Sequence, residues 1–121
     1  MDFTELKLKS ELRQTLSRMN YTTLTPIQER CIPPLLAGES LIAQSRTGSG
    51  KTLAYALPLL EKIRFETFLP QALILVPTRE LALQVKQTLD NVGMYCRTRH
   101  LLLIGRQPFR FQREDLKQRT H

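Results

Sequence analysis

Three short apolar runs, separated by segments with helical patterning, most constrain the fold of this chain. They cover residues 41–44, 72–76 and 101–104, and turn-forming residues bound them. Each run is too short for a buried helix, and its unbroken apolar character suits a strand that is covered on both faces. Because helices separate the runs, the sequence predicts an α/β fold with a parallel sheet and crossover helices.

Two helices are predicted before the first apolar run. Residues 9–19 place leucine and methionine side chains on one helical face. A second helix begins after Thr25, whose spacing to Gln28 fits a capping box with proline at the first helical position. Pro33–Pro34 predict an interruption of this helix, which should end near Gly38.

Two further helices are predicted between the apolar runs. The first covers residues 51–64, with a kink expected at Pro58. The second begins after Thr78, a suitable N-cap, and ends just before Gly93. Its apolar side chains recur at helical spacing on one stripe, as expected for a helix that packs on a sheet.

The composition is that of a globular protein of one domain. The chain has 121 residues, of which 41% are hydrophobic and 24% charged. No apolar run approaches the roughly 18 residues of a membrane span, and the N-terminus has no signal-peptide pattern. Cys31 and Cys96 are isolated, which predicts two free thiols and no zinc site. An intracellular location, in the cytoplasm or nucleus, is therefore expected.

Positive charge is concentrated near the C-terminus. The formal net charge is +7, and residues 97–121 contribute seven basic and two acidic side chains to it. Such a basic end suits a nucleic acid or another polyanion as partner. A solvated polar segment without a partner explains the same composition equally well.

A glycine-rich loop follows the first apolar run and precedes a helix. It consists of Ser45, Arg46, Thr47, Gly48, Ser49, Gly50, Lys51 and Thr52. Its end matches the P-loop pattern GxxxxGK[ST], with Ser45 in place of the first glycine.

The chemistry of a phosphate site explains these residue types. Gly48 and Gly50 let the backbone curl so that N–H groups face phosphate oxygens, and the helix that follows adds its positive end. Lys51 would reach the β- and γ-phosphates, and the Thr52 hydroxyl would take a Mg²⁺ position. A glycine-rich turn without a ligand is the alternative interpretation.

Three segments together resemble the DEAD-box ATP-dependent RNA helicases. Residues 20–28, with Phe3 upstream, resemble the Q motif of that family. The glycine-rich loop is similar to the family's AxTGSGKT, and residues 77–82 match its motif Ia, PTRELA. The resemblance extends to about Gly105. It implies a P-loop NTPase (RecA-like) domain with a parallel sheet and flanking helices, of which this chain would hold an incomplete N-terminal portion.

The resemblance implies an adenine site beside the loop. Gln28 would read the adenine edge, since an amide can donate to one ring position and accept from the exocyclic amine. Phe3 and Tyr21 would pack around the base, and Thr25 would support the loop. The alternatives are a capping-box role for Gln28 and core positions for the two aromatic residues.

The resemblance also implies contact with an RNA backbone. Pro77, Thr78, Arg79 and Glu80 would bind sugar-phosphate groups through a cation and free helix N–H groups. Such contacts read no base, so binding would be independent of sequence and sensitive to salt. The alternative is an ordinary capped helix start with a solvated Arg79.

The catalytic acids of that family have no counterpart in the sequence. No Asp-Glu-Ala-Asp occurs, and the adjacent pair Glu114–Asp115 is predicted to be a solvated charge cluster. Phosphoryl transfer requires a carboxylate to hold the metal. We therefore expect the chain to bind ATP and Mg²⁺ without hydrolysing the nucleotide or unwinding RNA.

The expected organisation is a truncated ATP-binding domain. Residues 1–38 form a Q-motif region, and residues 39–121 form the P-loop α/β part, ending before the DEAD motif. Apolar strand edges would be left open, so self-association or a partner that completes the sheet is expected. The alternative function is a non-catalytic module that binds RNA or protein.

Overall fold

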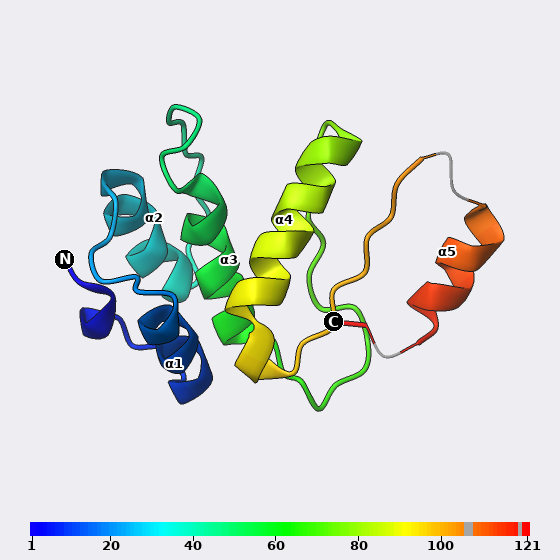
Figure 1. The fold of residues 1–121 in the computed structure, drawn as a ribbon, viewed down its shortest axis with the longest axis horizontal. Helices are drawn as coiled ribbons and strands as arrows, with labels where there is room; N and C mark the ends of the chain where they lie inside the picture. Colours follow the sequence, from blue (N-terminus) through cyan, green and yellow to red (C-terminus); the bar gives the residue numbers. More distant parts are fainter. Residues whose placement is uncertain (106–107, 119) are drawn as a thin grey trace.

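The computed structural model describes residues 1–105, 108–118 and 120–121. Five α-helices lie within these ranges and follow one another across the molecule (Figure 1). They are α1 (Ser10–Arg18), α2 (Pro26–Leu36), α3 (Lys51–Lys62), α4 (Arg79–Val92) and α5 (Phe109–Leu116), with 3₁₀ turns at Phe3–Glu5 and Met94–Cys96. None of these helices is long and apolar enough to cross a membrane.

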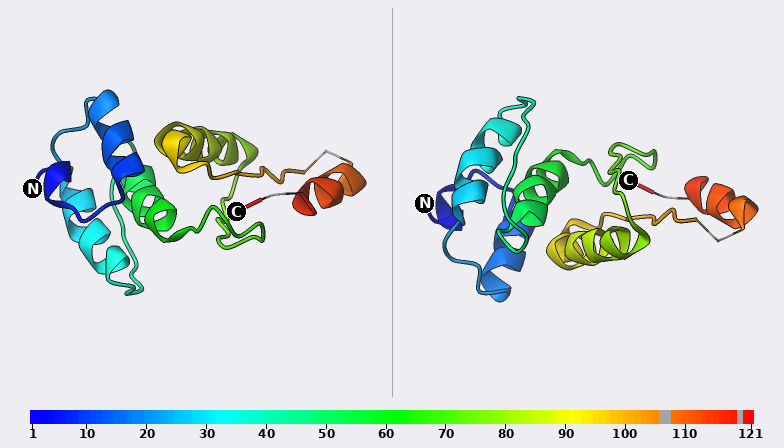
Figure 2. Two further views of the ribbon diagram at one scale, coloured as in Figure 1. Left: turned by 90° about the horizontal axis from the view of Figure 1, so that it is seen from below. Right: turned by 90° about the horizontal axis from the view of Figure 1, so that it is seen from above.

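The core lies between the first four helices. Each helix contributes at least one side chain with no more than 2% exposure: Leu12 from α1, Ile32 from α2, Leu57 and Leu60 from α3, and Val92 from α4. Helix α3 packs against both α2 and α4, and therefore holds the two halves of this core together. Helix α5 buries none of its residues and stands apart at the far end of the molecule (Figure 2).

The predicted sheet is not confirmed, because the described residues contain no β-strand. Residues 41–44, 73–76 and 101–104 make no backbone–backbone hydrogen bond within the described part of the chain. A strand exists only where a neighbouring strand completes its ladder, and these three segments do not lie next to one another as pairs. Their side chains are accordingly open: Ile42 is fully exposed and Leu75 is 84% exposed.

The predicted positions of the first four helices are confirmed, the interruption predicted in the second helix is not, and the kink expected at Pro58 stays a prediction. Helix α4 begins after Thr78 and ends before Gly93, as its capping residues indicate. Helix α2 instead continues through Pro33 and Pro34, so the predicted interruption is wrong. The carbonyl oxygens of both prolines accept backbone hydrogen bonds, from Ala37 and Glu39 respectively, each at 3.0 Å. A proline costs a helix one N–H and a clash with the carbonyl four residues earlier, and the packing of α2 against α3 outweighs this cost.

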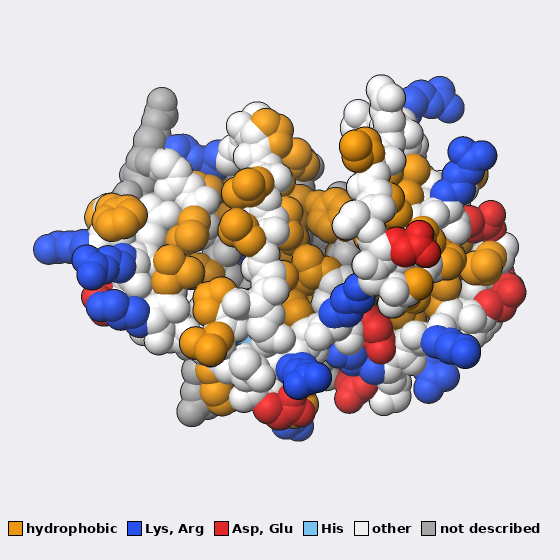
Figure 3. All heavy atoms as spheres, turned by 180° about the vertical axis from the view of Figure 1, so that it is seen from behind, with side chains coloured by type: hydrophobic (Ala, Val, Ile, Leu, Met, Phe, Trp, Pro, Cys, Tyr) orange, Lys and Arg blue, Asp and Glu red, His pale blue; other side chains and the backbone are white. Residues whose placement is uncertain are grey.

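Hydrophobic side chains are exposed across the middle of one face. In the view from behind they lie between groups of charged side chains at both ends of the molecule (Figure 3). Along residues 72–76 the exposure alternates, since Leu73 and Leu75 are exposed while Ile74 and Val76 pack against the core. This period of two is the side-chain pattern of a strand, although no neighbouring strand is present among the described residues.

Candidate nucleotide-binding site

The glycine-rich loop caps the start of helix α3. Gly50 is the N-cap residue with a φ of 92°, and Gly48 has a φ of 79°. Both values lie in the left-handed region, where a side chain is disfavoured, so the loop depends on glycine at these positions. The curled backbone leaves the N-terminal N–H groups of α3 facing the loop, which is the arrangement of an anion site.

The side chain of Lys51 turns back into this loop. Its Nζ donates hydrogen bonds to the carbonyl oxygens of Ser45 and Arg46, the latter at 2.7 Å. The ammonium group is thereby held against two neutral carbonyl dipoles instead of a carboxylate. A phosphate oxygen would be a stronger partner for this cation than either carbonyl group.

The Gln28 side chain links the Q-motif region to the loop. Its Nε2 donates to the carbonyl oxygen of Gly50 at 3.2 Å, and its Oε1 accepts from the backbone N–H of Thr25 at 3.0 Å. Gln28 is only 4% exposed. The predicted bond to the Thr25 backbone is thus present. Because an amide has two N–H groups and two lone pairs, one of each is left for a ligand, and the adenine role stays a prediction.

Two hydroxyl groups beside this link are buried without a hydrogen-bond partner in the described part of the chain. They are Thr25 Oγ1 and Ser49 Oγ. Thr25 Oγ1 faces the backbone N–H of Gln28, as in a capping box, but the two groups do not meet the geometry of a hydrogen bond. An unpaired buried hydroxyl costs about 1–3 kcal/mol, so such groups usually indicate a ligand or an ordered water.

The two predicted base-packing aromatics lie together but differ in exposure. Phe3 is 3% exposed and belongs to the core, whereas Tyr21 is 42% exposed. Their ring centroids are 6.0 Å apart with an interplanar angle of 56°. Phe3 therefore supports Tyr21 from the core side, and Tyr21 is the more exposed of the two rings; the base-packing role of both stays a prediction.

Tyr55 is a neighbour of the predicted metal ligand that sequence reasoning missed. Burial raises the pKa of Tyr55, and a hydrogen bond with the Thr52 side chain lowers it in part. The available signal was the spacing of three residues between them, which places both on one side of α3. Thr52 thus already has a hydroxyl partner in the helix.

The predicted RNA-contacting segment forms the start of helix α4. The Thr78 hydroxyl accepts a hydrogen bond from the Leu81 N–H at 3.2 Å, which caps the helix. Arg79 is not simply solvated, because its Nη2 donates to the carbonyl oxygen of Gly105 at 2.8 Å. Pro77 and Glu80 are exposed. The N-terminus of α4 lies at the same end of the molecule as the glycine-rich loop (Figure 1).

The loop, its lysine and the N-terminus of α3 have the arrangement expected of an anion site of the P-loop class, and phosphate binding at this loop stays a prediction. The chain belongs to the DEAD/DEAH box helicase family, whose family model matches residues 25–121.

Curated relatives of the chain are DEAD-box RNA helicases. It is 42% identical over 119 residues to the ATP-dependent rRNA helicase RRP3 of Candida glabrata, covering 98% of this chain and 24% of that protein. It is 38% identical over 119 residues to the ATP-dependent RNA helicase DbpA of Bacillus subtilis, covering 98% of this chain and 25% of that protein. The chain therefore spans about a quarter of the length of these relatives.

Solved structures with the same arrangement are RecA-like DEAD-box helicase domains. A DEAD box protein from the hyperthermophile Methanococcus jannaschii matches with a TM-score of 0.86 and 32% identity, over 100% of this chain and 33% of that chain. The RNA helicase Prp28 from Chaetomium thermophilum bound to ADP matches with a TM-score of 0.82 and 32% identity, over 97% and 30% of the two chains. The helices and connecting segments thus follow the path seen in these domains, although the described residues form no sheet.

Proposed function

We propose that this chain is the ATP-binding and RNA-backbone-binding portion of a DEAD-box ATP-dependent RNA helicase. Its family membership and its relatives support the parent activity. The observation that carries the nucleotide part is the hydrogen bond between Gln28 and Gly50, which joins an adenine-reading candidate to the phosphate-binding candidate.

In this proposal the residues of the loop hold the phosphate groups. Lys51 exchanges its two carbonyl partners for phosphate oxygens, and Ser49 Oγ supplies a buried hydroxyl that has no partner within the described residues. The remaining N–H and lone pair of Gln28 are directed to the adenine edge, and the exposed Tyr21 covers a face of the base. The bound ATP would fit these residues because unpaired polar groups and a cation converge at one loop.

The metal ion would enter with the nucleotide. Mg²⁺ prefers oxygen ligands and commonly uses substrate phosphates with one or two protein groups, and Thr52 is the protein group that this loop offers. The described residues contain no cluster of three or more histidine, cysteine or acidic side chains. Since hydrolysis needs a carboxylate to hold the metal and a group to position water, we expect the 121-residue chain to bind ATP without turnover.

The N-terminus of α4 is the proposed RNA contact. Arg79 supplies a cation, and the helix supplies a positive end with Thr78 as its cap. Neither feature reads a base, so we expect weak binding that does not depend on RNA sequence.

Titration with fluorescent ATP and GTP analogues tests the nucleotide site. Lys51→Ala should weaken ATP-analogue binding about tenfold or more, because a charge-assisted contact is lost. Lys62→Ala removes the same charge from the exposed end of α3 and should bind like the unaltered chain. Equal affinity of all three chains would contradict the site.

The same titration tests base selection. Gln28→Ala should reduce the preference for ATP over GTP, whereas Gln14→Ala, an exposed glutamine on α1, should leave it unchanged. Thermal unfolding followed by circular dichroism shows whether each variant is folded. A chain that binds RNA but neither nucleotide would instead support a non-catalytic RNA-binding module.

A further inference from the structure

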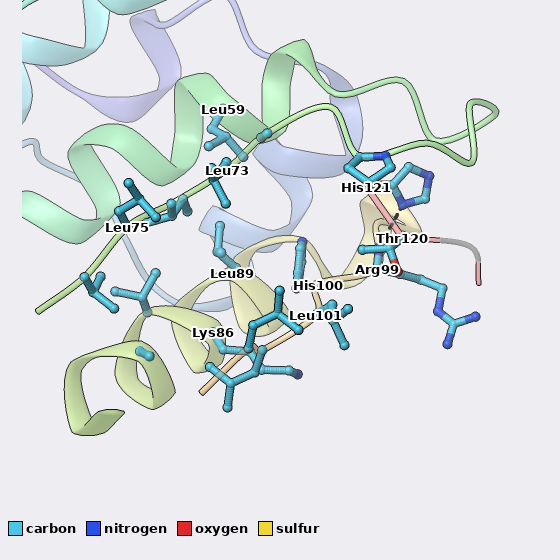
Figure 4. A pocket seen from close by; sticks show the side chains of 18 of the residues that line it. Leu59, Leu73, Leu75, Lys86, Leu89, Arg99, His100, Leu101, Thr120 and His121 are labelled. Carbon is cyan, nitrogen blue, oxygen red and sulfur yellow. Dashed lines mark hydrogen bonds between the residues drawn. The ribbon is translucent and has the colours of Figure 1, made fainter. Parts of the chain in front are cut away.

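The imidazole ring of His121 joins two connecting segments that are distant in sequence. His121 is only 6% exposed and lies beside Arg99, at one end of an apolar cavity of about 470 Å³ (Figure 4). Its Nδ1 is 3.0 Å from the backbone nitrogen of Arg99, and its Nε2 is 2.9 Å from the carbonyl oxygen of Phe65. The ring therefore links the segment of residues 64–72 to the segment of residues 97–99.

These two partners fix the protonation state of the ring. The Arg99 backbone N–H can only donate, so His121 Nδ1 must be an acceptor. The Phe65 carbonyl oxygen can only accept, so Nε2 must carry the hydrogen. An imidazole with one N–H group is neutral, whereas the charged form has an N–H on both nitrogens. The closed arrangement therefore requires the neutral ring with its hydrogen on Nε2.

Proton uptake at Nδ1 is incompatible with this arrangement. Two N–H groups would face each other, and the Arg99 N–H would lose its acceptor. Within the described ranges, neither the Arg99 N–H nor the Phe65 carbonyl group has a backbone partner, so the ring is what pairs them. A polar group that is left unpaired inside a protein is costly, so the charged ring should leave its place.

Cations outnumber carboxylates on the two linked segments. Their charged side chains are all exposed: Arg64, Glu66, Arg97 and Arg99. The Arg97 guanidinium group lies over the Phe65 ring, 5.9 Å from its centroid. Among the described residues, no ion pair includes His121. No paired carboxylate therefore stabilises a proton on this ring.

The charged groups of α3 and α5, which also line the cavity, have partners of their own or are exposed. Glu61 of α3 accepts from the Lys9 backbone N–H at 2.8 Å, and Lys62 is exposed. On α5, the Lys117 ammonium group contacts Glu114 at 3.3 Å, and the other charged side chains of this helix are exposed. These helices therefore add no ion pair to the ring in the part of the chain that the structure describes.

The second histidine of the chain has partners of the opposite kind. His100 Nδ1 is 2.8 Å from the Asp90 carboxylate, which Lys86 also contacts at 2.6 Å. His100 Nε2 is 2.9 Å from the Thr98 hydroxyl. A carboxylate accepts, and a hydroxyl can accept as well as donate, so a charged His100 keeps both contacts. The two histidines should therefore respond differently to acid.

We propose that His121 is a pH-sensitive clasp, in which the neutral ring holds residues 64–72 against residues 97–99 and the protonated ring releases both contacts. Histidine ordinarily changes charge between about pH 5 and pH 8, so the clasp is closed at the upper end of this range and opens as the pH falls. The backbone bonds of His121 to Arg99 and Ala72, at 3.1 and 3.2 Å, do not involve the ring. Opening is therefore confined to the ring and the groups that it pairs.

The apolar loop next to the ring is the part that opening frees. The Phe68 ring centroid lies 6.0 Å from that of the imidazole, and Phe65, Phe68 and Leu69 are all exposed. Release of the Phe65 carbonyl group removes the bond that ties this loop to His121. The inference is independent of nucleotide or RNA binding.

Nitrogen-15 NMR of the imidazole rings, recorded from pH 8 to pH 5, tests the protonation states. We expect His121 to carry its hydrogen on Nε2 alone at pH 8 and to become charged as the pH falls. A His121 ring with its hydrogen on Nδ1 at pH 8 would overturn the proposal, and so would a ring that is still neutral at pH 5.

Amide hydrogen exchange at Arg99 tests the release. Its protection is the exchange rate of an unstructured peptide at the same pH divided by the measured rate, and it should fall at least tenfold from pH 8 to pH 5. His121→Asn offers an amide oxygen near the position of Nδ1 and does not titrate, so its Arg99 protection should not fall. His100→Asn is the matched control and should retain the fall of the unaltered chain.

Amides of α1 that stay protected at both pH values show that each chain remains folded. With α1 protected, a constant protection of Arg99 in the unaltered chain would overturn the proposal. An equal fall in His121→Asn, or a fall that disappears in His100→Asn, would also overturn it, because the titrating group would then not be His121.

Discussion

The Nε2 atom of Gln28 donates a hydrogen bond to the carbonyl oxygen of Gly50 at 3.2 Å. The two residues are 22 positions apart in sequence, and Gly50 is also the N-cap of α3. The start of α2 and the glycine-rich loop therefore form one unit. A substitution at either residue should therefore disturb the position of the other.

Gly50→Ala should destabilise the fold strongly. A Cβ at this position would lie 2.5 Å from Gln28 Nε2 and 3.1 Å from Thr25 Oγ1, at a φ of 92°. The left-handed backbone and the overlap should together cost about 2–4 kcal/mol of unfolding free energy, measured by urea denaturation. Gly48→Ala is the matched control, because its φ of 79° carries similar backbone strain but its Cβ would meet nothing within 4 Å.

A double-mutant cycle separates the overlap from the strain. Gln28→Ala removes the group that a new Cβ would strike, so the Gly50→Ala penalty should shrink in its presence. Equal penalties for Gly50→Ala with and without Gln28, or for Gly50→Ala and Gly48→Ala, would show that this contact does not restrict the loop.

Thr78→Ala should weaken helix α4. The Thr78 hydroxyl accepts from the Leu81 N–H at 3.2 Å, and loss of an N-cap of this kind costs about 1 kcal/mol. Thr78→Ser keeps the hydroxyl and should retain most of the unfolding free energy in urea denaturation. If serine and alanine lower it equally, the hydroxyl is not the stabilising group.

The Asp90 carboxylate should make stability fall at acid pH. Burial acts to raise the pKa of Asp90, but hydrogen bonds with Lys86 and His100 outweigh burial, so this pKa lies below the ordinary value of an aspartate. A carboxyl group whose pKa is lower in the folded than in the unfolded chain stabilises the fold at pH values above its unfolded pKa. This stabilisation is lost as the pH falls through the folded pKa. The unfolding free energy should therefore drop between pH 5 and pH 2.

Asp90→Asn should reduce that drop, by about 0.5 kcal/mol, because the carboxylate is partly exposed. The exposed Asp115 on α5 provides the comparison, and Asp115→Asn should leave the pH profile of urea unfolding nearly unchanged. Identical profiles for the unaltered chain and Asp90→Asn would exclude a stabilising role for this cluster.

Arg79→Ala should lower the salt dependence of RNA binding. If Arg79 contacts one phosphate group, the slope of log affinity against log salt should fall by about one, to the same extent for RNAs of different sequence. Arg13→Ala removes an exposed arginine from α1 and is the control. An unchanged slope for Arg79→Ala, measured by fluorescence anisotropy, would place the RNA contact elsewhere.

Local signals explain which features were predictable. Some features depend only on neighbours within a few residues, so they can be predicted without knowledge of distant contacts. They are the N-cap Thr78, the glycines of the loop and the apolar faces of α1 and α4. The same local reasoning failed at Pro33–Pro34, where packing of α2 against α3 outweighs the proline penalty. Helix α5 was not predicted, since it has no apolar face that the core buries.

The candidate site was predictable in part. The sequence indicated Gln28, Lys51 and Thr52, but not that Gln28 bonds to Gly50, that Arg79 bonds to Gly105 or that Tyr55 bonds to Thr52. The first two contacts join residues 22 and 26 positions apart, and no spacing rule reports them. The third follows helical spacing and could have been found.

By itself, the amino-acid sequence determined the positions of the first four helices, the phosphate-loop pattern and the resemblance to one helicase family, because propensity, capping and motif spacing are local properties. Only the tertiary structure decided what the apolar runs do. Strand pairing requires a neighbour at about 4.8 Å, and residues 72–76 and 101–104 do not have each other as that neighbour. Whether an apolar run forms a strand depends on two segments together, so it cannot be predicted from the sequence of one segment alone.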